Sequence, residues 1–369
     1  MGDNSNYPIT MDALLTLAVE QNASDVHLAP GAPPLFRINR NLARLEDQPV
    51  LTPKDISALL GQILRPEQLQ SLERDLELDF SYSVDNVARF RGNVMYQRGS
   101  QAVAFRIVPF KVPDIDTLGL PPAAKDLCFL PRGLVLVTGP TGSGKSTTLA
   151  AMIDLINRER SLNIVTVEDP IEFLHNHKQS SVKQREVGLD THSFANALRH
   201  VLRHDPDVIL IGEMRDLESI SIALTAAETG HLVFSTLHTQ TAPLTVNRIV
   251  DVFQEHQRNQ IRQQLAGSLQ GVISQQLIPT ADGKGRVLAA EYLGVNAAVR
   301  TLIREGKEHQ LYTVMQTSQA AGMRTMDQAL AQLCLSGKIT RDEALERCVD
   351  RIELERLLQK QSFAYSPKL

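Results

Sequence analysis

One glycine-rich segment limits the possible folds of this chain to a narrow set: Gly139-Pro140-Thr141-Gly142-Ser143-Gly144-Lys145-Ser146. Its pattern, G-x-x-x-x-G-K-S, turns backbone N–H groups around a β-phosphate, while the lysine reaches the β- and γ-phosphates and the serine hydroxyl binds Mg²⁺. An apolar run at 134–137 precedes it, and a helix-compatible segment from Thr147 to Arg158 follows. We therefore predict a buried parallel strand, an ATP-binding loop over Gly139–Thr147 with Ser146 on Mg²⁺, and a helix N-terminus facing the phosphates. A chance glycine-rich turn is the alternative, and the flanking strand and helix argue against it.

The pattern of apolar residues predicts two domains. Residues 1–110 read as a small α+β domain, with helices at Met11–Gln21 and within Pro53–Asp75, the latter broken at Pro66, and strands at Asp25–Leu28, Phe80–Val84, Ala88–Gln97 and Ala102–Val108. A proline-containing linker at 111–123 follows. Residues 124–369 alternate strands (134–138, 164–168, 208–212, 232–236) with helices, which indicates an α/β fold with a mostly parallel sheet. From about residue 255 helices should dominate, including Asp327–Leu335 and Arg341–Arg347.

Composition bounds the class of protein. The 369 residues are 43% hydrophobic and 22% charged, as in ordinary globular proteins. The net charge of −4 and pI of 6.2 argue against a protein that coats DNA. Cys128, Cys334 and Cys348 form no C-x-x-C pair, so we expect reduced thiols, no zinc site and a cytoplasmic location. No apolar stretch approaches the ~18 residues that cross a bilayer, and any membrane association is expected to come through a partner.

Acidic residues follow two of the predicted strands. Glu168 and Asp169 end the strand at 164–168, at the edge where open α/β sheets gather their ligands. A carboxylate there can orient the water that attacks a γ-phosphate, although a strand-ending turn with solvated acids explains it equally well in isolation. After 208–211, Gly212 stands where a Walker B aspartate is expected and the acid comes next, as Glu213. Glu213 can still serve Mg²⁺.

Two histidines flank one core strand. His231 precedes, and His238 follows, the apolar run at 232–237. A lone histidine in such a position is usually structural, but a pair on one strand raises the prospect of phosphate sensing by a neutral imidazole. Zinc is disfavoured because no third ligand stands at metal spacing.

Arginines are concentrated on the strands of the first domain: Arg89, Arg91, Arg98 and Arg106. They form either a solvated strand face or arginine fingers that reach a neighbouring subunit's nucleotide, an effect of about 10³–10⁵ in rate. Composition does not choose between these alternatives.

Four further boxes accompany the glycine-rich loop in a fixed order: Glu168-Asp169-Pro170-Ile171-Glu172-Phe173, Gln184-Arg185-Glu186-Val187-Gly188, Gly212-Glu213-Met214-Arg215-Asp216 and Thr229-Gly230-His231…Thr236-Leu237-His238. Together they resemble the type II/IV secretion ATPases and, within them, the PilT-type pilus retraction ATPases. The resemblance runs from about Met11 to Leu335.

The resemblance implies a homohexamer in which an N-terminal PAS-like domain and a C-terminal RecA-like ATPase domain hold ATP and Mg²⁺ between them. Glu168 would activate water and Glu213 would serve Mg²⁺, with Lys145, His231 and His238 in the catalytic set. Arg91, Arg98 and Arg106 match the family's basic positions. The implied partners are an inner-membrane pilus platform protein and a second retraction ATPase, at the inner face of the cytoplasmic membrane, with no direct contact to nucleic acid.

Two features refine the resemblance. The chain lacks the additional N-terminal region and four-cysteine zinc module of the extension and type II secretion relatives, which favours retraction. The retraction motif A-I-R-N-L-I-R-E appears as Ala298-Val299-Arg300-Thr301-Leu302-Ile303-Arg304-Glu305, which leaves room for an accessory paralogue or another secretion or DNA-uptake ATPase. Other function classes stay open: a nucleic-acid translocase, a non-enzymatic ring subunit and, more remotely, a small-molecule kinase.

Overall fold

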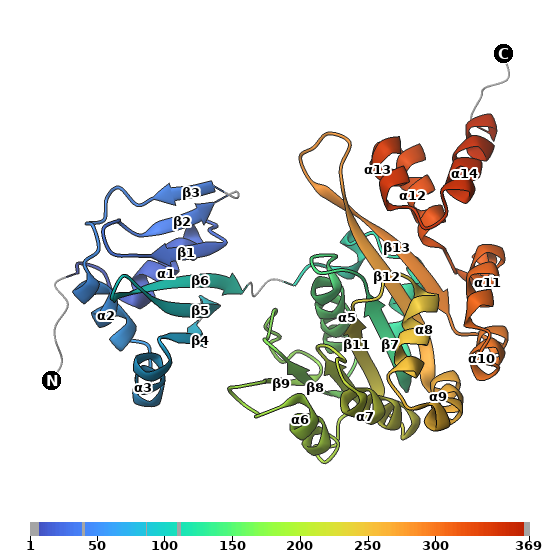
Figure 1. Ribbon diagram of the computed structural model, residues 1–369, viewed down its shortest axis with the longest axis horizontal. Coiled ribbons are helices and arrows are strands. Elements are labelled where there is room, and N and C mark those ends of the chain that lie inside the picture. Colours follow the sequence, from blue (N-terminus) through green and yellow to red (C-terminus); the bar gives the residue numbers. More distant parts are fainter. Residues whose placement is uncertain (1–6, 39–40, 86, 109–111, 365–369) are drawn as a thin grey trace. The chain divides into compact units, whose positions relative to one another are not determined.

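The chain forms two compact units in the computed structural model, Met1–Lys111 and Val112–Leu369 (Figure 1). The structure describes residues 7–38, 41–85, 87–108 and 112–364, with side chains of the last helix up to Gln359. Within these ranges, every helix is too short or too polar to traverse a bilayer.

The first unit is an antiparallel sheet with helices packed against it. The sheet order is β3-β2-β1-β6-β5-β4. Its elements are α1 (Met11–Glu20), β1 (Asp25–Leu28), β2 (Leu35–Ile38), β3 (Asn41–Arg44), α2 (Pro53–Gly61), α3 (Pro66–Asp75), β4 (Glu77–Val84), β5 (Ala88–Gln97) and β6 (Ser100–Val108). Thr10 and Thr52 cap α1 and α2, and a proline starts α3, so the predicted break at Pro66 is confirmed. Sequence patterning missed β2 and β3, because Phe36 alone is buried in β2 and β3 is exposed throughout, so neither strand has the buried face of β1.

The second unit is built on a seven-stranded sheet of order β13-β12-β7-β11-β10-β8-β9. Its strands are β7 (Gly133–Thr138), β8 (Asn163–Glu168), β9 (Ser181–Glu186), β10 (Val208–Ile211), β11 (Leu232–Leu237), β12 (Leu269–Pro279) and β13 (Arg286–Gly294). All neighbours pair in parallel except β12 and β13, which form an antiparallel hairpin. Every residue of β7, β10 and β11 is buried, as expected for strands covered on both faces.

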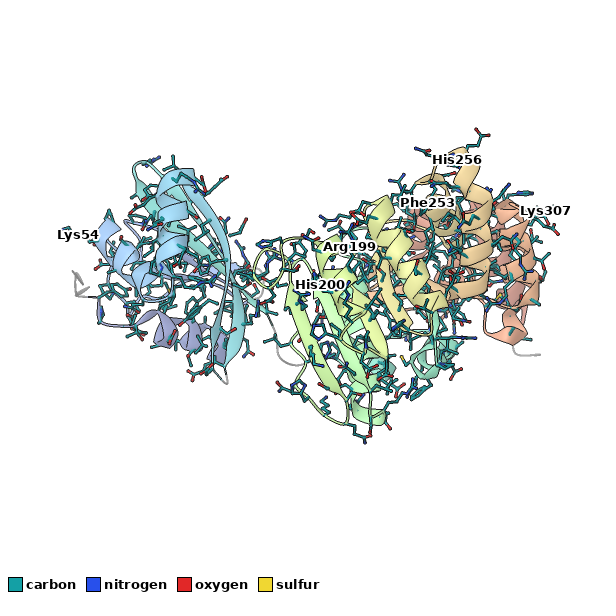
Figure 2. The ribbon with its side chains drawn as sticks, turned by 90° about the horizontal axis from the view of Figure 1, so that it is seen from below. Lys54, Arg199, His200, Phe253, His256 and Lys307 are labelled. Carbon is teal, nitrogen blue, oxygen red and sulfur yellow. The ribbon has the colours of Figure 1, made fainter. Side chains whose placement is uncertain are left out.

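Helices cover the two faces of this sheet. One face carries α5 (Lys145–Glu159) with the short α4 (Pro122–Asp126). The other carries α6 (Phe194–Val201), α7 (Leu217–Glu228), α8 (Ala242–Asp251), α9 (Glu255–Ser268), α10 (Ala297–Arg304) and α11 (Leu311–Thr317). In Figure 2, Arg199 and His200 mark α6, Phe253 marks the connection from α8 to α9, and His256 marks the first turn of α9. The expectation that helices dominate after residue 255 overlooked the β12–β13 hairpin, whose far end packs against α12 (Met326–Leu335), α13 (Arg341–Arg347) and α14 (Arg351–Ala364).

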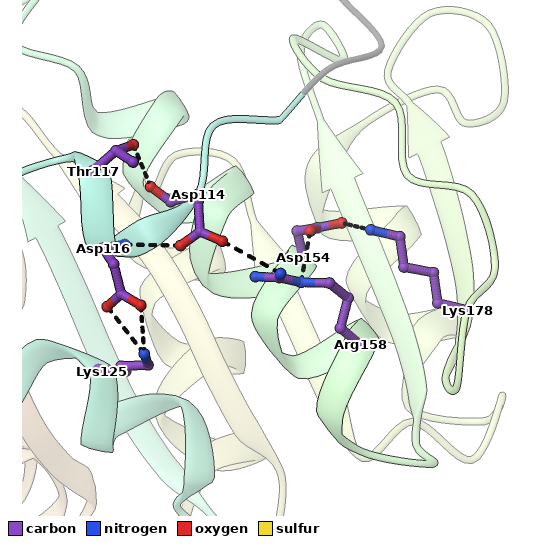
Figure 3. Close-up of polar contacts among 7 residues, drawn as sticks. All are labelled: Asp114, Asp116, Thr117, Lys125, Asp154, Arg158 and Lys178. Carbon is purple, nitrogen blue, oxygen red and sulfur yellow. Dashed lines mark hydrogen bonds and ion pairs between the residues drawn. The ribbon is translucent and has the colours of Figure 1, made fainter.

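The segment expected as a linker packs against the second unit from Val112 onward. Ile115 is buried in the core beneath α5. The Asp114 carboxylate accepts a hydrogen bond from the Asp116 backbone, and Arg158 of α5 lies 3.3 Å from it. Arg158 also pairs with Asp154, 3.2 Å away on the same helix (Figure 3). The chain entering this unit is thus held at the C-terminal half of the helix that begins with Lys145.

Candidate active site

The glycine-rich loop joins β7 to α5 in a conformation that requires its glycines. Gly139 has φ of 140°, and a Cβ there would lie 2.3 Å from the Gln275 carbonyl oxygen and 2.6 Å from the Ser143 hydroxyl. Gly144 caps α5 in the left-handed region, with φ of 92°. The predicted strand, loop and helix are confirmed, and the N-terminus of a 15-residue helix faces the bend of the loop.

Lys145 lies across this loop. Its ammonium donates to the Gly139 carbonyl at 2.9 Å and to the Pro140 carbonyl at 3.1 Å. Burial lowers the pKa of Lys145, and the nearby charges of Glu213 and Glu172 oppose that shift. The lysine is therefore a pre-positioned cation at the site where phosphates would be held.

A cavity of about 600 Å³ opens over the loop. The predicted residues in its wall are Thr141, Gly142, Gly144, Lys145, Ser146, Thr147, Glu168, Glu213 and His238. Gly139, Pro140 and Ser143 belong to the same loop without lining the cavity. The glycine-rich loop and the two acidic residues are far apart in the sequence, but they line the same cavity of the second unit.

Glu168 ends β8 at the cavity wall. Its Oε1 accepts hydrogen bonds from the Thr166 hydroxyl at 2.7 Å and from Gln184 Nε2 at 3.1 Å. Burial raises the pKa of Glu168, while these hydrogen bonds oppose the shift. The carboxylate is held in place rather than solvated, which is the arrangement that a group orienting a reactant requires.

Glu213 forms the centre of a second cluster. Its Oε2 lies 2.9 Å from Arg215 Nε, and its Oε1 lies 3.1 Å from His238 Nε2. The hydrogen bond to Glu213 raises the pKa of Arg215. Gly212, the departure from the Walker B pattern, has a physical reason: a Cβ there would approach the Glu168 Cα to 3.3 Å. Glycine avoids this tight contact, and the acid stands one residue further on.

His231 does not reach this site. It precedes β11, at the amino edge of the sheet, and its Nδ1 lies 2.9 Å from the Ala226 carbonyl oxygen. The six residues of β11 separate it from His238 by about 20 Å, at ~3.3 Å per residue. Of the two histidines, His238 lines the cavity and His231 lies at the opposite edge of the sheet. The predicted catalytic role of His231 stays a prediction.

The three arginines predicted to contact phosphate lie in the first unit. Arg91 and Arg106 are directly opposed on β5 and β6, and Arg98 occupies the intervening turn with φ of 49°. Arg106 pairs with Asp25 at 3.0 Å, although 69% of its side chain is exposed. Their predicted contact with phosphate stays a prediction.

Several residues of the site were given no role from the sequence, although Phe173 and Gln184 stand in two of the boxes. Thr166 and Gln184 hold Glu168, and Gln275 of β12 contacts α5, where its Nε2 donates to the Thr148 hydroxyl at 2.7 Å. Phe173, His175, Phe194, Leu277 and Arg286 also line the cavity. The position of Thr166, two residues before Glu168 on the same strand face, was a signal in the sequence, whereas the other contacts depend on unpredicted strand neighbours.

Comparison with known proteins agrees with this geometry. A model of the family described as "Type II/IV secretion system protein" matches residues 2–355. The chain belongs to this family. It is 49% identical to the type IV pilus retractation ATPase PilT of Pseudomonas aeruginosa, over 90% of this chain and 96% of the relative. It is 39% identical to the type IV pilus ATPase PilU of the same organism, over 90% and 87%.

Solved structures of the family share the fold. A crystal structure of the pilus retraction motor PilT with bound ADP superposes with a TM-score of 0.88 at 52% identity, covering 94% of this chain and 99% of that one. The Legionella pneumophila ATPase DotB superposes with a TM-score of 0.79 at 30% identity, covering 93% and 97%. The predicted fold class, a RecA-like α/β ATPase domain with a smaller N-terminal α+β domain, is confirmed.

Proposed function

We propose that this protein is a Mg²⁺-dependent ATPase that drives type IV pilus retraction. The observation that carries the proposal is the single cavity in which the glycine-rich loop, Glu168 and the Glu213–His238 pair meet. The 49% identity to PilT supports the cellular role.

The donor set fits ATP and Mg²⁺. The α5 N-terminus and Lys145 supply positive potential for the phosphates. In the described part of the chain, no group of three His, Cys, Asp or Glu side chains could hold a metal, so a cation here would depend on Ser146, Glu213 and the phosphates together. Bound Mg²⁺ would neutralise charge that develops on the phosphates.

The strand order indicates which way the nucleotide would lie. Glu168, Glu213 and His238 follow β8, β10 and β11, on one side of β7. The γ-phosphate would therefore lie on that side, and the nucleoside would extend over the opposite neighbours, β12 and β13. Leu277 and Arg286 line the cavity there.

Each residue then has a defined task. Lys145 binds β- and γ-oxygens, Glu168 orients the attacking water, and His238 holds Glu213 where it can face the cation through a water or directly. Arg91, Arg98 and Arg106 would add charge stabilisation to phosphate from the first unit.

The remaining assignments follow the family. We propose a homohexamer at the cytoplasmic face of the inner membrane, acting on a pilus platform protein and working beside a second retraction ATPase. The alternative is an accessory paralogue, favoured by the 39% identity to PilU and by Val299 and Thr301 in the retraction motif. Deleting the gene separates retraction from extension, since hyperpiliated, non-twitching cells support retraction and bald cells contradict it. If another retraction ATPase by itself restores twitching in the deletion strain, that result favours the accessory role.

The biochemical test uses the purified full chain. Phosphate release with and without Mg²⁺ should show metal-dependent turnover, abolished in Lys145→Ala and reduced about 10²–10⁴-fold in Glu168→Gln. Lys183→Ala is the matched control, because this exposed β9 side chain donates to Asn163 Oδ1 and does not line the cavity. Turnover that is absent in the folded wild type, or unchanged in Lys145→Ala, would refute the proposal. A fully active monomer would refute the hexamer.

A further inference from the structure

Gln184 lies beside the carboxylate proposed to orient water. It occupies β9, which pairs in parallel with β8 so that Gln184 is opposite Thr166, two residues before Glu168. β9 has a polar sequence, Ser-Val-Lys-Gln-Arg-Glu, at the edge of the sheet. The Gln184 side chain is half-buried, and its hydrogen bonds point into the second unit rather than to solvent.

Both the nitrogen and the oxygen of the Gln184 side-chain amide form hydrogen bonds with the segment 168–175. Its Nε2 donates to Glu168 Oε1 at 3.1 Å and to the Phe173 carbonyl oxygen at 2.9 Å. Its Oε1 accepts from the His175 backbone N–H at 2.8 Å. The three hydrogen bonds join the end of β8 to the segment 173–175.

Only one orientation of the amide satisfies these contacts. A flipped amide would place its oxygen against the Glu168 carboxylate and the Phe173 carbonyl, which are both acceptors, and its NH₂ against the His175 N–H, a donor. The partners therefore fix which atom faces Glu168.

The same segment forms a wall of the nucleotide cavity, because both Phe173 and His175 line it. Thr166 donates to the same oxygen of Glu168, Oε1, at 2.7 Å. One side of the carboxylate is thus held by its own strand and by the neighbouring strand, and the neighbouring strand in turn holds the cavity wall.

We propose that Gln184 is a positioning residue for ATP hydrolysis, which holds the Glu168 carboxylate and couples its position to the cavity wall at Phe173–His175. The inference rests on the proposed function. It assigns Gln184 no contact with the nucleotide, so its loss should change the chemical step more than nucleotide affinity.

Gln184 also influences the ionisation of Glu168. Burial raises the pKa of Glu168, the hydrogen bonds from Thr166 and Gln184 lower it, a backbone contact from Glu172 lowers it further, and the charge of Glu172 raises it. Removing the amide N–H should therefore move the acidic limb of the kcat profile to higher pH.

The test compares Gln184→Leu and the isosteric Gln184→Glu with wild type and with the β9 control Lys183→Ala. Gln184→Leu removes a hydrogen bond to a charged group. We expect this loss to lower kcat about 10- to 100-fold. The affinity for ADP should stay within threefold. Gln184→Glu, which places an acceptor against the carboxylate, should lose at least as much kcat and shift the acidic limb further.

Hydrogen exchange gives a readout that does not depend on turnover. The His175 N–H loses its acceptor in Gln184→Leu, so the segment containing it should exchange at least tenfold faster than in Lys183→Ala. If wild type shows no turnover but exchange at His175 accelerates, the proposed function fails and the positioning contact stands. Unchanged exchange, or kcat within twofold of wild type in either variant, overturns the inference. If Gln184→Leu does not fold, the kcat and pH profile of Gln184→Glu decide.

Discussion

Glu291 is a fully buried carboxyl group that joins two helices of the second unit. Its Oε1 accepts from the Ala242 backbone N–H, at the start of α8, at 2.6 Å. Its Oε2 accepts from the Met326 N–H, at the start of α12, at 3.2 Å. Burial raises the pKa of Glu291 to about 7, and the charge of Asp327 adds to that rise against the two backbone hydrogen bonds. Folding therefore favours the protonated form.

The size of this effect on stability follows from linkage. The pKa rises from 4.5 to about 7 on folding, which at about 1.4 kcal/mol per pH unit corresponds to about 3 kcal/mol. Because the folded pKa lies above the unfolded one, the contribution is fully present below pH 4.5 and is lost as the pH rises through 7. Between pH 5 and pH 8, ionisation of Glu291 should lower the free energy of unfolding by most of that amount.

Glu291→Gln removes the titration and keeps the volume of the side chain. Urea unfolding of the full chain, followed by far-UV circular dichroism because the chain has no Trp, should be measured at pH 5, 6, 7 and 8. Between pH 5 and pH 8 the variant should lack about 2.5 kcal/mol of the wild-type decline. Glu305→Gln is the control, since Glu305 is exposed and paired with Lys307, and it should keep the wild-type pH dependence. Equal declines in wild type and Glu291→Gln would refute the reasoning.

Three further predictions concern the loop, the second cluster and a buried ion pair. Gly139→Ala should weaken ADP binding more than tenfold by titration calorimetry, because the new Cβ would collide with the Gln275 carbonyl oxygen at 2.3 Å, and unchanged affinity would contradict it. His238→Ala removes the imidazole that bonds the acid after β10, so steady-state kinetics should show kcat about tenfold lower with little change in KM. Arg262→Ala leaves the Glu308 carboxylate, 3.0 Å from Arg262 Nε, buried without its partner and should cost about 3 kcal/mol in urea unfolding, whereas a loss below 1 kcal/mol would show that the site readily rehydrates.

The elements that could be predicted from the sequence are those whose structure depends on residues close together in the chain. The loop from Gly139 to Ser146 was predictable because glycine conformations, a lysine and a helix start are encoded within one short stretch. The central strands were predictable because their apolar residues run without interruption, as strands buried on both faces require.

The missed strands share a different property. β12 includes Ser274, Gln275 and Gln276, polar residues that the apolar pattern of a core strand excludes. Two of them bond to distant partners: the Ser274 hydroxyl to the Thr138 hydroxyl, and Gln275 Nε2 to the Thr148 hydroxyl. Such contacts arise from strand order, which no local pattern contains.

The two histidines illustrate a rule of parallel sheets. Residues before a strand and residues after it lie at opposite edges, and ligands gather at the carboxyl edge. That rule places His238 with Glu213 at the carboxyl edge and His231 at the other edge, as in the structure. Gln184 is the opposite case, because its role depends on β9 pairing with β8, and β9 was not predicted.

Helix α5 connects the glycine-rich loop to the chain segment that enters the second unit. The rise along the helix from Lys145 at the loop to Arg158, which pairs with Asp114, is about 20 Å. Exposed pairs of this kind contribute at most about 1 kcal/mol, so the stability of this attachment comes mainly from Ile115, which is buried under the helix. The ion pairs instead restrict the direction in which the segment leaves α5. A displacement of the loop would therefore move the segment with the helix, because a packed α-helix transmits it as a rigid body.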